Sequence, residues 1–223
     1  MHTARLRNTK EEFRVGKIIC VGRNYAEHAK EMKADLPESP VLFLKPSTAL
    51  VDDGGTIIIP PIKSELHHEV ELTVLIETGG KNITEQSALS HIAGYGIGLD
   101  MTLRDVQAEA KKKGLPWTLA KGFDTSAPIS EFIPASKVNN PHALDIKLRL
   151  NGVVKQNSNT RHFIFRIEQL ISYISQFFTL EPGDIIFTGT PEGVGPVRPG
   201  DHLEAELSEP DGELLVSLKV AVR

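Results

Sequence analysis

The sequence predicts a strand-rich α+β domain, and three observations support this class. Short runs of Val, Ile and Leu recur along the chain between Gly, Pro and Asn residues, which is typical of β-strands. Helical spacing of apolar residues is confined to a few segments. The chain has 223 residues, of which 40% are hydrophobic, enough for one substantial core, and it contains no repeat or linker. We therefore expect one domain over residues 17–223, preceded by a short N-terminal arm, residues 1–16.

The predicted strands follow the apolar runs in chain order. They cover residues 17–21, 41–44, 56–59, 69–76, 92–99, 144–150, 184–188 and 214–222. A hairpin is predicted around Asn151-Gly152, with residues 153–156 as its second strand, because this dipeptide accepts positive φ at both turn positions.

Three helices are predicted, over residues 24–33, 102–113 and 166–178. The first has Asn24 as its expected N-cap and Glu27 three residues later, which is close to a capping box. The second is expected to end at Gly114, a residue type that is common after helix C-termini. The third carries four apolar residues on one stripe and is the best candidate for a core helix.

Composition excludes several classes of protein. With 25 Lys and Arg against 29 Asp and Glu, the net charge of −4 argues against a basic face for nucleic-acid binding. The single cysteine, Cys20, cannot form an internal disulfide. No apolar run approaches the roughly 20 residues that cross a bilayer. Residues 1–14 lack the apolar segment of a secretory signal. We expect a cytoplasmic enzyme or binding protein with no nucleic-acid or membrane partner.

The strongest local signal is the sequence His67-His68-Glu69-Val70-Glu71-Leu72. Side chains alternate faces along a strand, so Val70 and Leu72 point into a core while Glu69 and Glu71 lie side by side on the other face. Adjacent carboxylates repel each other unless they share a proton or bind a cation. A solvated outer face is the competing interpretation, with about equal weight.

A third carboxylate favours the cation. Asp100 ends a predicted strand that follows soon after the Glu69/Glu71 strand, so pairing of the two strands would bring the three acids together. Asp is also a common helix cap, and a helix is predicted directly after Asp100. Three oxygen ligands without a nearby cysteine suit Mg²⁺, Mn²⁺ or Ca²⁺ rather than zinc. The adjacent histidines are a weak zinc signal, and we expect a supporting or structural role for them.

His28 and Glu31 form a second constellation. Their separation of three residues puts both on one face of the first predicted helix. A carboxylate bonded to one ring nitrogen fixes the tautomer and makes the other nitrogen more basic, so the pair is a candidate for activating water. An exposed histidine beside a surface acid is the more frequent arrangement, at about two cases in three.

A glycine-rich segment, residues 188–195, follows the strand predicted over residues 184–188. Its backbone N–H groups and the hydroxyl of Thr190 suit a small carboxylate, although a plain turn between strands is also consistent with it. It is not a P-loop, because no Lys and no helix follow.

Three other polar residues are candidates for the same pocket. Lys121 lies between an apolar stretch and a turn, where its ammonium could stabilise an oxyanion, although surface lysines are commoner. Gln107 lies two helical turns after Asp100, so both can face one pocket. Arg23 lies beside the His28 helix. Arg23 and Gln107 could equally be exposed.

Taken together, four motifs in series resemble the fumarylacetoacetate hydrolase family. They are G-R-N-Y-x-x-H-x-x-E at 22–31, H-H-E-V-E-L at 67–72, G-L-D-M-T-L-R-D-V-Q at 98–107 and T-G-T-P-x-G-V-G at 188–195. The chain is most similar to short single-domain, acylpyruvase-like members. The resemblance implies a β-rich sandwich roll of mixed sheets with a few helices, a single catalytic domain and a homodimer.

The resemblance also implies roles for the candidate residues. Glu69, Glu71 and Asp100 would be the ligands of a divalent cation, normally Mg²⁺, with Mn²⁺ or Ca²⁺ as alternatives. His28 and Glu31 would be a catalytic pair on a mobile segment, with Lys121 beside them. Residues of the substrate pocket would be Arg23, Gln107 and Thr190.

The implied substrate is a small 2-oxo acid, whose carboxylate and carbonyl suit a hard cation. We expect hydrolysis of the C–C bond of acylpyruvates to a carboxylate and pyruvate. The alternatives are oxaloacetate decarboxylation or tautomerisation, or the isomerase/decarboxylase activity on 2-hydroxyhepta-2,4-diene-1,7-dioate. An enolate is common to all of them. A protein that binds a metal without turnover is a different class, against which the His28/Glu31 pair argues.

Overall fold

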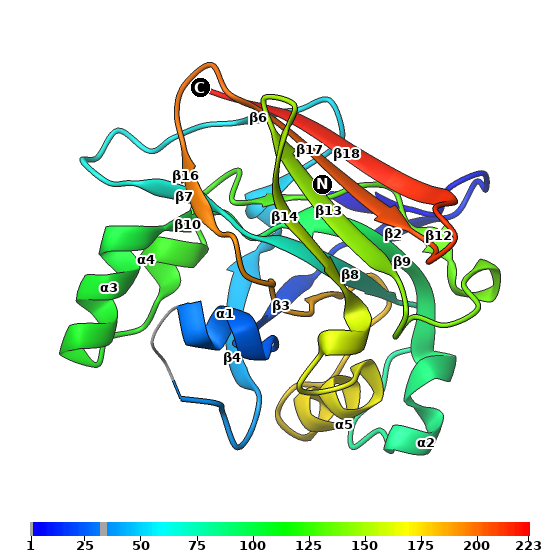
Figure 1. Ribbon diagram of the computed structural model, residues 1–223. Coiled ribbons are helices and arrows are strands. Elements are labelled where there is room, and N and C mark those ends of the chain that lie inside the picture. Colours follow the sequence, from blue (N-terminus) through cyan, green and yellow to red (C-terminus); the bar gives the residue numbers. More distant parts are fainter. Residues whose placement is uncertain (1, 32–34) are drawn as a thin grey trace.

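The computed structural model describes residues 2–31 and 35–223 and has the predicted α+β class (Figure 1). A central sheet contains six strands in the spatial order β12 (Ile133–Pro134), β9 (Ile92–Leu99), β8 (Val70–Ile76), β15 (Ile185–Phe187), β3 (Lys17–Gly22) and β4 (Val41–Pro46). Its neighbouring strands are antiparallel, except that β15 and β3 are parallel. The sheet is therefore mixed.

A second sheet lies across the first in Figure 1. Its five strands are, in spatial order, β14 (Val153–Asn159), β13 (Asp145–Leu150), β17 (His202–Ser208), β18 (Leu214–Val222) and β6 (Thr56–Ile57). Only β18 and β6 are parallel. The two sheets form the layers of a β-rich roll.

Three small sheets complete the strand structure. One pairs β1 (Thr3–Arg5) with β2 (Glu12–Arg14), and another pairs β5 (Leu50–Val51) with β11 (Ala127–Pro128). The third has the order β10 (Thr102–Leu103), β7 (Leu66–His68) and β16 (Gly195–Val197).

The helices gather at the two ends of the sheets. They are α1 (Ala26–Glu31), α2 (Glu85–Ala88), α3 (Arg104–Lys113), α4 (Thr118–Lys121) and α5 (Ile167–Phe177). In Figure 1, α3 and α4 lie together at one end, α2 and α5 at the other, and α1 between them. None of the helices formed by the described residues has the length and apolar character needed to cross a membrane.

Apolar side chains cover both faces of the central sheet. From β8, Val70, Leu72, Val74 and Ile76 join a core that includes β13, β17 and helix α5, whereas Leu75 points to the opposite face. On that opposite face, Phe187 and Cys20 pack with residues of the N-terminal arm, among them Leu6. This alternation puts the side chain of Glu71 on the face opposite Val70, as predicted.

Most of the predicted strands are confirmed, with ends shifted by a few residues. The hairpin around Asn151-Gly152 is formed, with φ of 51° and 80° at the two residues. Strand β17 (His202–Ser208) was not predicted, although it pairs with both β13 and β18. Its side chains alternate between buried and accessible, and three of its seven residues are charged or His, which hid the strand from a search for apolar runs.

The three predicted helices are formed over shorter ranges. Thr102 and Leu103 belong to a strand, so the second helix begins at Arg104, and it ends at Gly114 in the left-handed conformation as expected. The first helix begins at Ala26, and positions 32 and 33 of its predicted range lie outside the described residues. Asn24 was wrongly predicted as its N-cap: the buried carboxamide donates to the carbonyls of Thr188 and Phe165 instead.

The pairing of β8 with β9 makes Gly98 sensitive to substitution. Gly98 lies opposite Glu71, and a Cβ atom there would come within 2.7 Å of the Phe187 ring. We expect Gly98→Ala to destabilise the fold by about 1–3 kcal/mol through overpacking, and so to lower Tm by roughly 2–12 °C in thermal unfolding. Gly195→Ala is the matched control, because its Cβ would contact only His68 at 3.5 Å. Equal Tm values for the two variants would contradict the packing argument.

Candidate active site and metal centre

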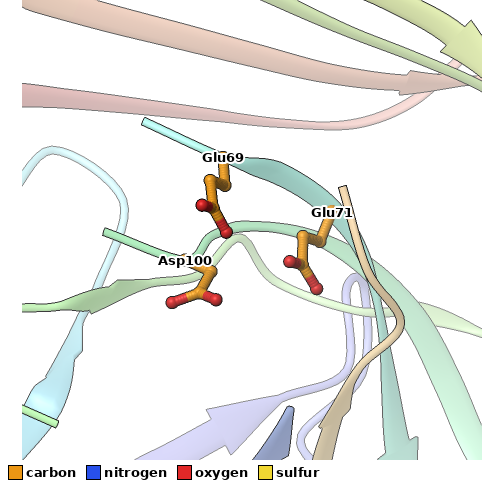
Figure 2. A group of neighbouring side chains, drawn as sticks. All are labelled: Glu69, Glu71 and Asp100. Carbon is orange, nitrogen blue, oxygen red and sulfur yellow. The ribbon is translucent and has the colours of Figure 1, made fainter. Parts of the chain in front are cut away.

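The predicted acidic triad is assembled where β8 meets β9. The backbone N–H of Asp100 donates to the carbonyl of Glu69 at 2.8 Å, which extends the strand pairing by one step beyond Val70 and Leu99. One carboxylate oxygen from each of Glu69, Glu71 and Asp100 lies within 4.8 Å of the others. Figure 2 shows the three carboxylates pointing toward a common space.

The triad is buried. Glu69 is 5% exposed, and Glu71 and Asp100 are 1% exposed, so the alternative of a solvated outer face is excluded. Asp100 does not cap helix α3 either, because Leu103 occupies the N-cap position. A buried carboxylate requires a cation or hydrogen-bond donors.

Lys121 supplies one of these cations. Its Nζ atom lies 2.7 Å from Glu69 and 2.6 Å from Asp100, and it also donates to the hydroxyl of Thr102 at 2.7 Å. Although burial disfavours the ammonium, Asp100 and Glu69 raise the pKa of Lys121 above its ordinary value. Lys121 is therefore a buried, protonated lysine that contacts two of the three acids.

Two further cations, which the sequence analysis did not identify, contact the triad. Arg104 at the start of α3 donates to Glu69, and Lys45 of β4, which is 1% exposed, lies 2.8 Å from Asp100. Although burial opposes ionisation, Lys121 and Arg104 hold the pKa of Glu69 well below its usual range. The sequence contained a signal for each of them: Lys45 lies within an apolar strand, and Arg104 lies three residues before Gln107.

Glu71 differs from its neighbours, because no cationic side chain of residues 2–31 and 35–223 forms an ion pair with it. It accepts one hydrogen bond, from the backbone N–H of Gly189 at 2.7 Å. Burial, together with Asp100 and Glu69, raises the pKa of Glu71 well above its ordinary value. The third carboxylate thus lacks the positive charge that its position requires, and a divalent cation among the three acids would supply it. The donor set of three carboxylates suits a hard cation.

His28 and Glu31 lie near the triad on α1. Nδ1 of His28 is 3.3 Å from a Glu31 carboxylate oxygen, as predicted from their spacing. His28 is 7% exposed, which excludes the alternative of a surface histidine. Burial lowers the pKa of His28 below its ordinary value, although the charges of Glu69 and Glu31 oppose the shift. The imidazole is neutral at pH 7, and with Glu31 accepting from Nδ1–H, Nε2 carries the free lone pair.

The glycine-rich segment connects these two groups. The Gly189 N–H binds Glu71, and the Gly193 N–H lies 3.2 Å from both carboxylate oxygens of Glu31. Both glycines have positive φ, 99° and 91°, and a Cβ at Gly193 would come within 2.3 Å of the Lys155 carbonyl. The predicted anion-binding amides therefore bind carboxylates of the protein itself.

Thr190 is held in the pocket wall by its hydroxyl. It donates to the carbonyl of Val70 at 2.8 Å and accepts from Gln156 at 2.9 Å. The carboxamide oxygen of Gln156 in turn accepts from the backbone N–H of Val70 and lies 3.0 Å from Nδ1 of His68. Gln156 thus links β14, β8 and the glycine-rich segment. The sequence did not predict this role, because Gln156 lies among other polar residues in the second strand of a hairpin.

One pocket collects the predicted residues. Its lining includes His28, Lys121, the three acids, Arg23, Gln107 and Thr190, whereas Glu31 lies behind His28 and outside the lining. The lining also contains Arg104 and Lys111, which were not predicted, together with the aromatic side chains of Phe43 and Trp117.

Comparison with known proteins is consistent with this geometry. The model of the fumarylacetoacetate (FAA) hydrolase C-terminal domain matches residues 17–223. Oxaloacetate tautomerase FAHD1, mitochondrial, of mouse (Mus musculus) is 51% identical over 203 residues, which cover 91% of this chain and 90% of that protein. The Arabidopsis thaliana protein of the same name is 49% identical over 86% of each chain.

Solved structures share the fold over nearly the whole chain. Fumarylpyruvate hydrolase from Pseudomonas aeruginosa, in complex with Mn²⁺ and pyruvate, has a TM-score of 0.92 and 39% identity, covering 99% of this chain and 95% of that one. A 2-hydroxyhepta-2,4-diene-1,7-dioate isomerase from Mycobacterium marinum has a TM-score of 0.80 and 36% identity, covering 93% and 74%. The fold thus occurs in a hydrolase and in an isomerase.

The absence of a cationic partner for Glu71 among the described residues leads to a prediction about metal binding. We expect Glu71→Gln to weaken Mn²⁺ binding at least about tenfold, because the substitution removes a ligand charge. The metal-free variant should have a Tm equal to or above that of the metal-free wild type, because a buried carboxylate without a cation is replaced by a neutral isostere. Calorimetric titration with Mn²⁺ and thermal unfolding with and without the metal measure the two effects.

The control for this substitution is Glu77→Gln, since Glu77 follows the opposite end of β8 and is exposed. It should keep the Mn²⁺ affinity and the Mn²⁺-induced rise in Tm. Unaltered Mn²⁺ binding by Glu71→Gln would rule out the triad as the metal site.

Proposed function

Because this chain belongs to the fumarylacetoacetate hydrolase family, we propose that it is a divalent-metal-dependent enzyme that acts on a small 2-oxo acid through its enolate. Glu69, Glu71 and Asp100 would hold the metal, with Mg²⁺ as the expected ion and Mn²⁺ as an alternative. The observation that carries the proposal is the convergence of the acidic triad, the Lys121 ammonium and the His28/Glu31 pair on one pocket.

Among the reactions that share an enolate, we place keto–enol tautomerisation of oxaloacetate first. Relatives with about half of their residues identical, over most of their length, carry this activity in their names. The reaction removes a proton from C3 and adds one to the C2 oxygen, and it breaks no C–C bond. It therefore requires a base near C3 and positive charge near the C2 oxygen.

His28 would be the base. Its neutral Nε2 takes the proton from C3, the C–H electron pair forms the C2=C3 double bond, and negative charge moves to the C2 oxygen. The imidazolium then gives this proton to the C2 oxygen, directly or through water, which completes the enol and restores the neutral base. Glu31 holds the ring in the required tautomer and stabilises the imidazolium that forms. Because Gly193 binds Glu31, the position of the base depends on the glycine-rich segment as well as on α1.

Positive charge at the C2 oxygen would come from two sources. A bound divalent cation acts as a Lewis acid that polarises the carbonyl. Lys121 adds a buried positive charge, and because its three N–H groups are engaged by Glu69, Asp100 and Thr102, its contribution in this arrangement is electrostatic.

Gln107 would orient the substrate. Arg104 donates to the Oε1 atom of Gln107 at 2.8 Å, which leaves the amide N–H groups for a substrate oxygen. Gln107 is 4% exposed, so this hydrogen bond would form out of contact with bulk water. Thr190 and Arg23 would complete the substrate pocket.

Hydrolysis of acylpyruvates is the second candidate, and the histidine–carboxylate pair favours it. In this reaction His28 takes a proton from water, the hydroxide adds to the C4 ketone, and the C3–C4 bond breaks to release a carboxylate and the pyruvate enolate. The solved hydrolase with a TM-score of 0.92 is named for an acylpyruvate of this type, fumarylpyruvate. Both candidates use the same base and the same enolate.

Two assays on one preparation separate the candidates. The disappearance of enol-oxaloacetate is followed by its ultraviolet absorbance, and pyruvate release from acetylpyruvate is followed with a coupled enzyme. We expect metal-dependent tautomerisation that is lost with EDTA and restored by Mg²⁺ or Mn²⁺. Metal binding without either reaction would instead indicate a binding protein and refute the proposed function.

Replacing His28 tests the assignment of the base. We expect His28→Ala to lower kcat for tautomerisation, and for hydrolysis where it occurs, by about 10²–10⁴-fold, the usual contribution of a positioned base. Lys30→Ala is the matched control on the same helix, because Lys30 is exposed and pairs with Glu27. Calorimetric titration with oxalate would check that the variant still binds a 2-oxo acid analogue, and full activity of His28→Ala would exclude it as the base.

The environment of His28 predicts the pH profile. A base acts in its neutral form, and burial lowers the pKa of His28 despite the opposing charges of Glu69 and Glu31, with Arg104 adding to the decrease. We therefore expect kcat/KM to stay level from about pH 8 down to about pH 6.5, the ordinary pKa of histidine, and to fall only below it. A measured inflection above pH 7 would contradict a neutral, buried base.

A further inference from the structure

One face of α3 contributes three side chains to the pocket. Arg104, Gln107 and Lys111 are spaced by three and four residues, which places them in a row along the helix. Arg104 reaches the acidic triad, and Gln107 lies next to it. Lys111 is two helical turns after Arg104, and its ammonium lies over the ring of Trp117 in the same lining.

Arg23 enters the same pocket from a fixed backbone position. Its φ of 61° is in the left-handed region, which costs about 1 kcal/mol for a residue with a Cβ. The neighbouring Asn24 is fully buried and bonded to Thr188 and Phe165, and these bonds hold the backbone in place. The side chain of Arg23 is thereby directed into the pocket lining.

Lys111 and Arg23 differ from the other cations of the pocket. Lys121 and Arg104 are ion-paired with the triad, but no carboxylate among the described residues lies within 4.0 Å of Lys111 or Arg23. The Lys111 ammonium lies instead 5.0 Å from the centre of the Trp117 ring. The side chain of Lys111 is exposed overall, but partial desolvation at the pocket and the charges of Arg104 and Arg23 lower its pKa, while Glu69 opposes the shift.

The rings of Phe43 and Trp117 form an aromatic wall of the pocket between Lys121 and Lys111. Lys121 lies 5.0 Å from the centre of the Phe43 ring, Phe43 contacts Trp117 with ring centres 5.8 Å apart, and Trp117 carries Lys111. The wall thus has a cation at each end. The pocket lining has four cationic side chains against three carboxylates, so a bound divalent cation would leave a clear excess of positive charge.

We propose, on the basis of the proposed function, that Lys111 and Arg23 bind a second carboxylate of the substrate, at the end opposite its 2-oxo acid group. The two residues then select 2-oxo dicarboxylates over 2-oxo monocarboxylates of the same shape. A dianion would offset most of the excess positive charge, and the second carboxylate would give the two unpaired cations the anion that the protein does not supply. Lys111 and Arg23 are specificity residues; neither needs to approach C2 or C3.

The direct test is a binding measurement that requires no turnover. Malate and 2-hydroxy-4-methylpentanoate have the same chelating end, and they differ in a carboxylate against an isopropyl group of similar shape. We expect the Mn²⁺-loaded protein to bind malate at least about tenfold more tightly in calorimetric titrations, the effect of a charge-assisted contact. Lys111→Met and Arg23→Met should each reduce this ratio to below about threefold.

Three controls make the result specific. Oxalate, which has no distal group, should bind both variants within about twofold of the wild type, because the inner site is unchanged. Lys112→Met, an exposed neighbour on α3, should keep the full preference for malate. Lys111→Arg should also keep most of it, because the positive charge remains.

The outcomes separate this inference from the proposed function. An unchanged malate preference in both Met variants would overturn the inference, and so would a parallel loss of oxalate binding, because the residues would then shape the inner site. Turnover is measured on the same variants, where kcat/KM for oxaloacetate should fall, through KM, about tenfold more than kcat/KM for acetylpyruvate. If the wild type turns over neither substrate, the proposed function fails, but the binding ratio still decides whether the pocket selects a dicarboxylate.

Discussion

The burial of three carboxylates at the junction of β8 and β9 is the constraint on which the rest of the site depends. Like charges confined in a low-dielectric interior must be compensated locally. Elements distant in sequence supply the compensation: Lys45 from β4, Arg104 from α3, Lys121 from α4 and a backbone amide from Gly189. Glu71 receives only the backbone amide and no cationic side chain of the described residues, and a divalent cation among the three acids would supply the missing positive charge.

The two functional groups of the pocket are mechanically connected. The acidic triad lies at the adjoining ends of β8 and β9 in the central sheet, whereas His28 and Glu31 lie on a short helix outside the sheet. The glycine-rich segment donates one amide to each group, to Glu71 and to Glu31. Its positive-φ glycines allow the backbone to approach both acids, which a residue with a Cβ could not do at Gly193. The glycine-rich segment therefore links the acidic triad to the His28/Glu31 pair.

Much of this arrangement could be predicted from the sequence. Alternation along residues 69–76 correctly separated the apolar face from Glu69 and Glu71, and the order of the strands correctly brought Asp100 to them. The helical spacing of His28 and Glu31 predicted their contact. These successes concern residues whose neighbours are fixed by local periodicity or by pairing of successive strands.

Contacts between distant segments could not be predicted in this way. Strand β17 was missed because an amphipathic strand with charged residues has no apolar run, and Asn24 was assigned to the helix next to it rather than to the Thr188 carbonyl. Lys45 is an isolated lysine in the sequence, and Lys111 belongs to a run of three lysines. Only the folded chain shows that Lys45 is buried against Asp100 and that Lys111 lies over Trp117. The roles of such residues depend on tertiary packing, which local patterns do not encode.

The double attachment of the glycine-rich segment bears on how this fold diversifies. Because this segment donates one amide to Glu71 and one to Glu31, insertions or deletions there would alter the spacing between α1 and the carboxylate cluster while the sheets stay intact. A change of chemistry would then require remodelling of a single connection rather than of the scaffold. The glycine-rich segment is therefore the place where a change in loop length would move His28 relative to the acidic triad.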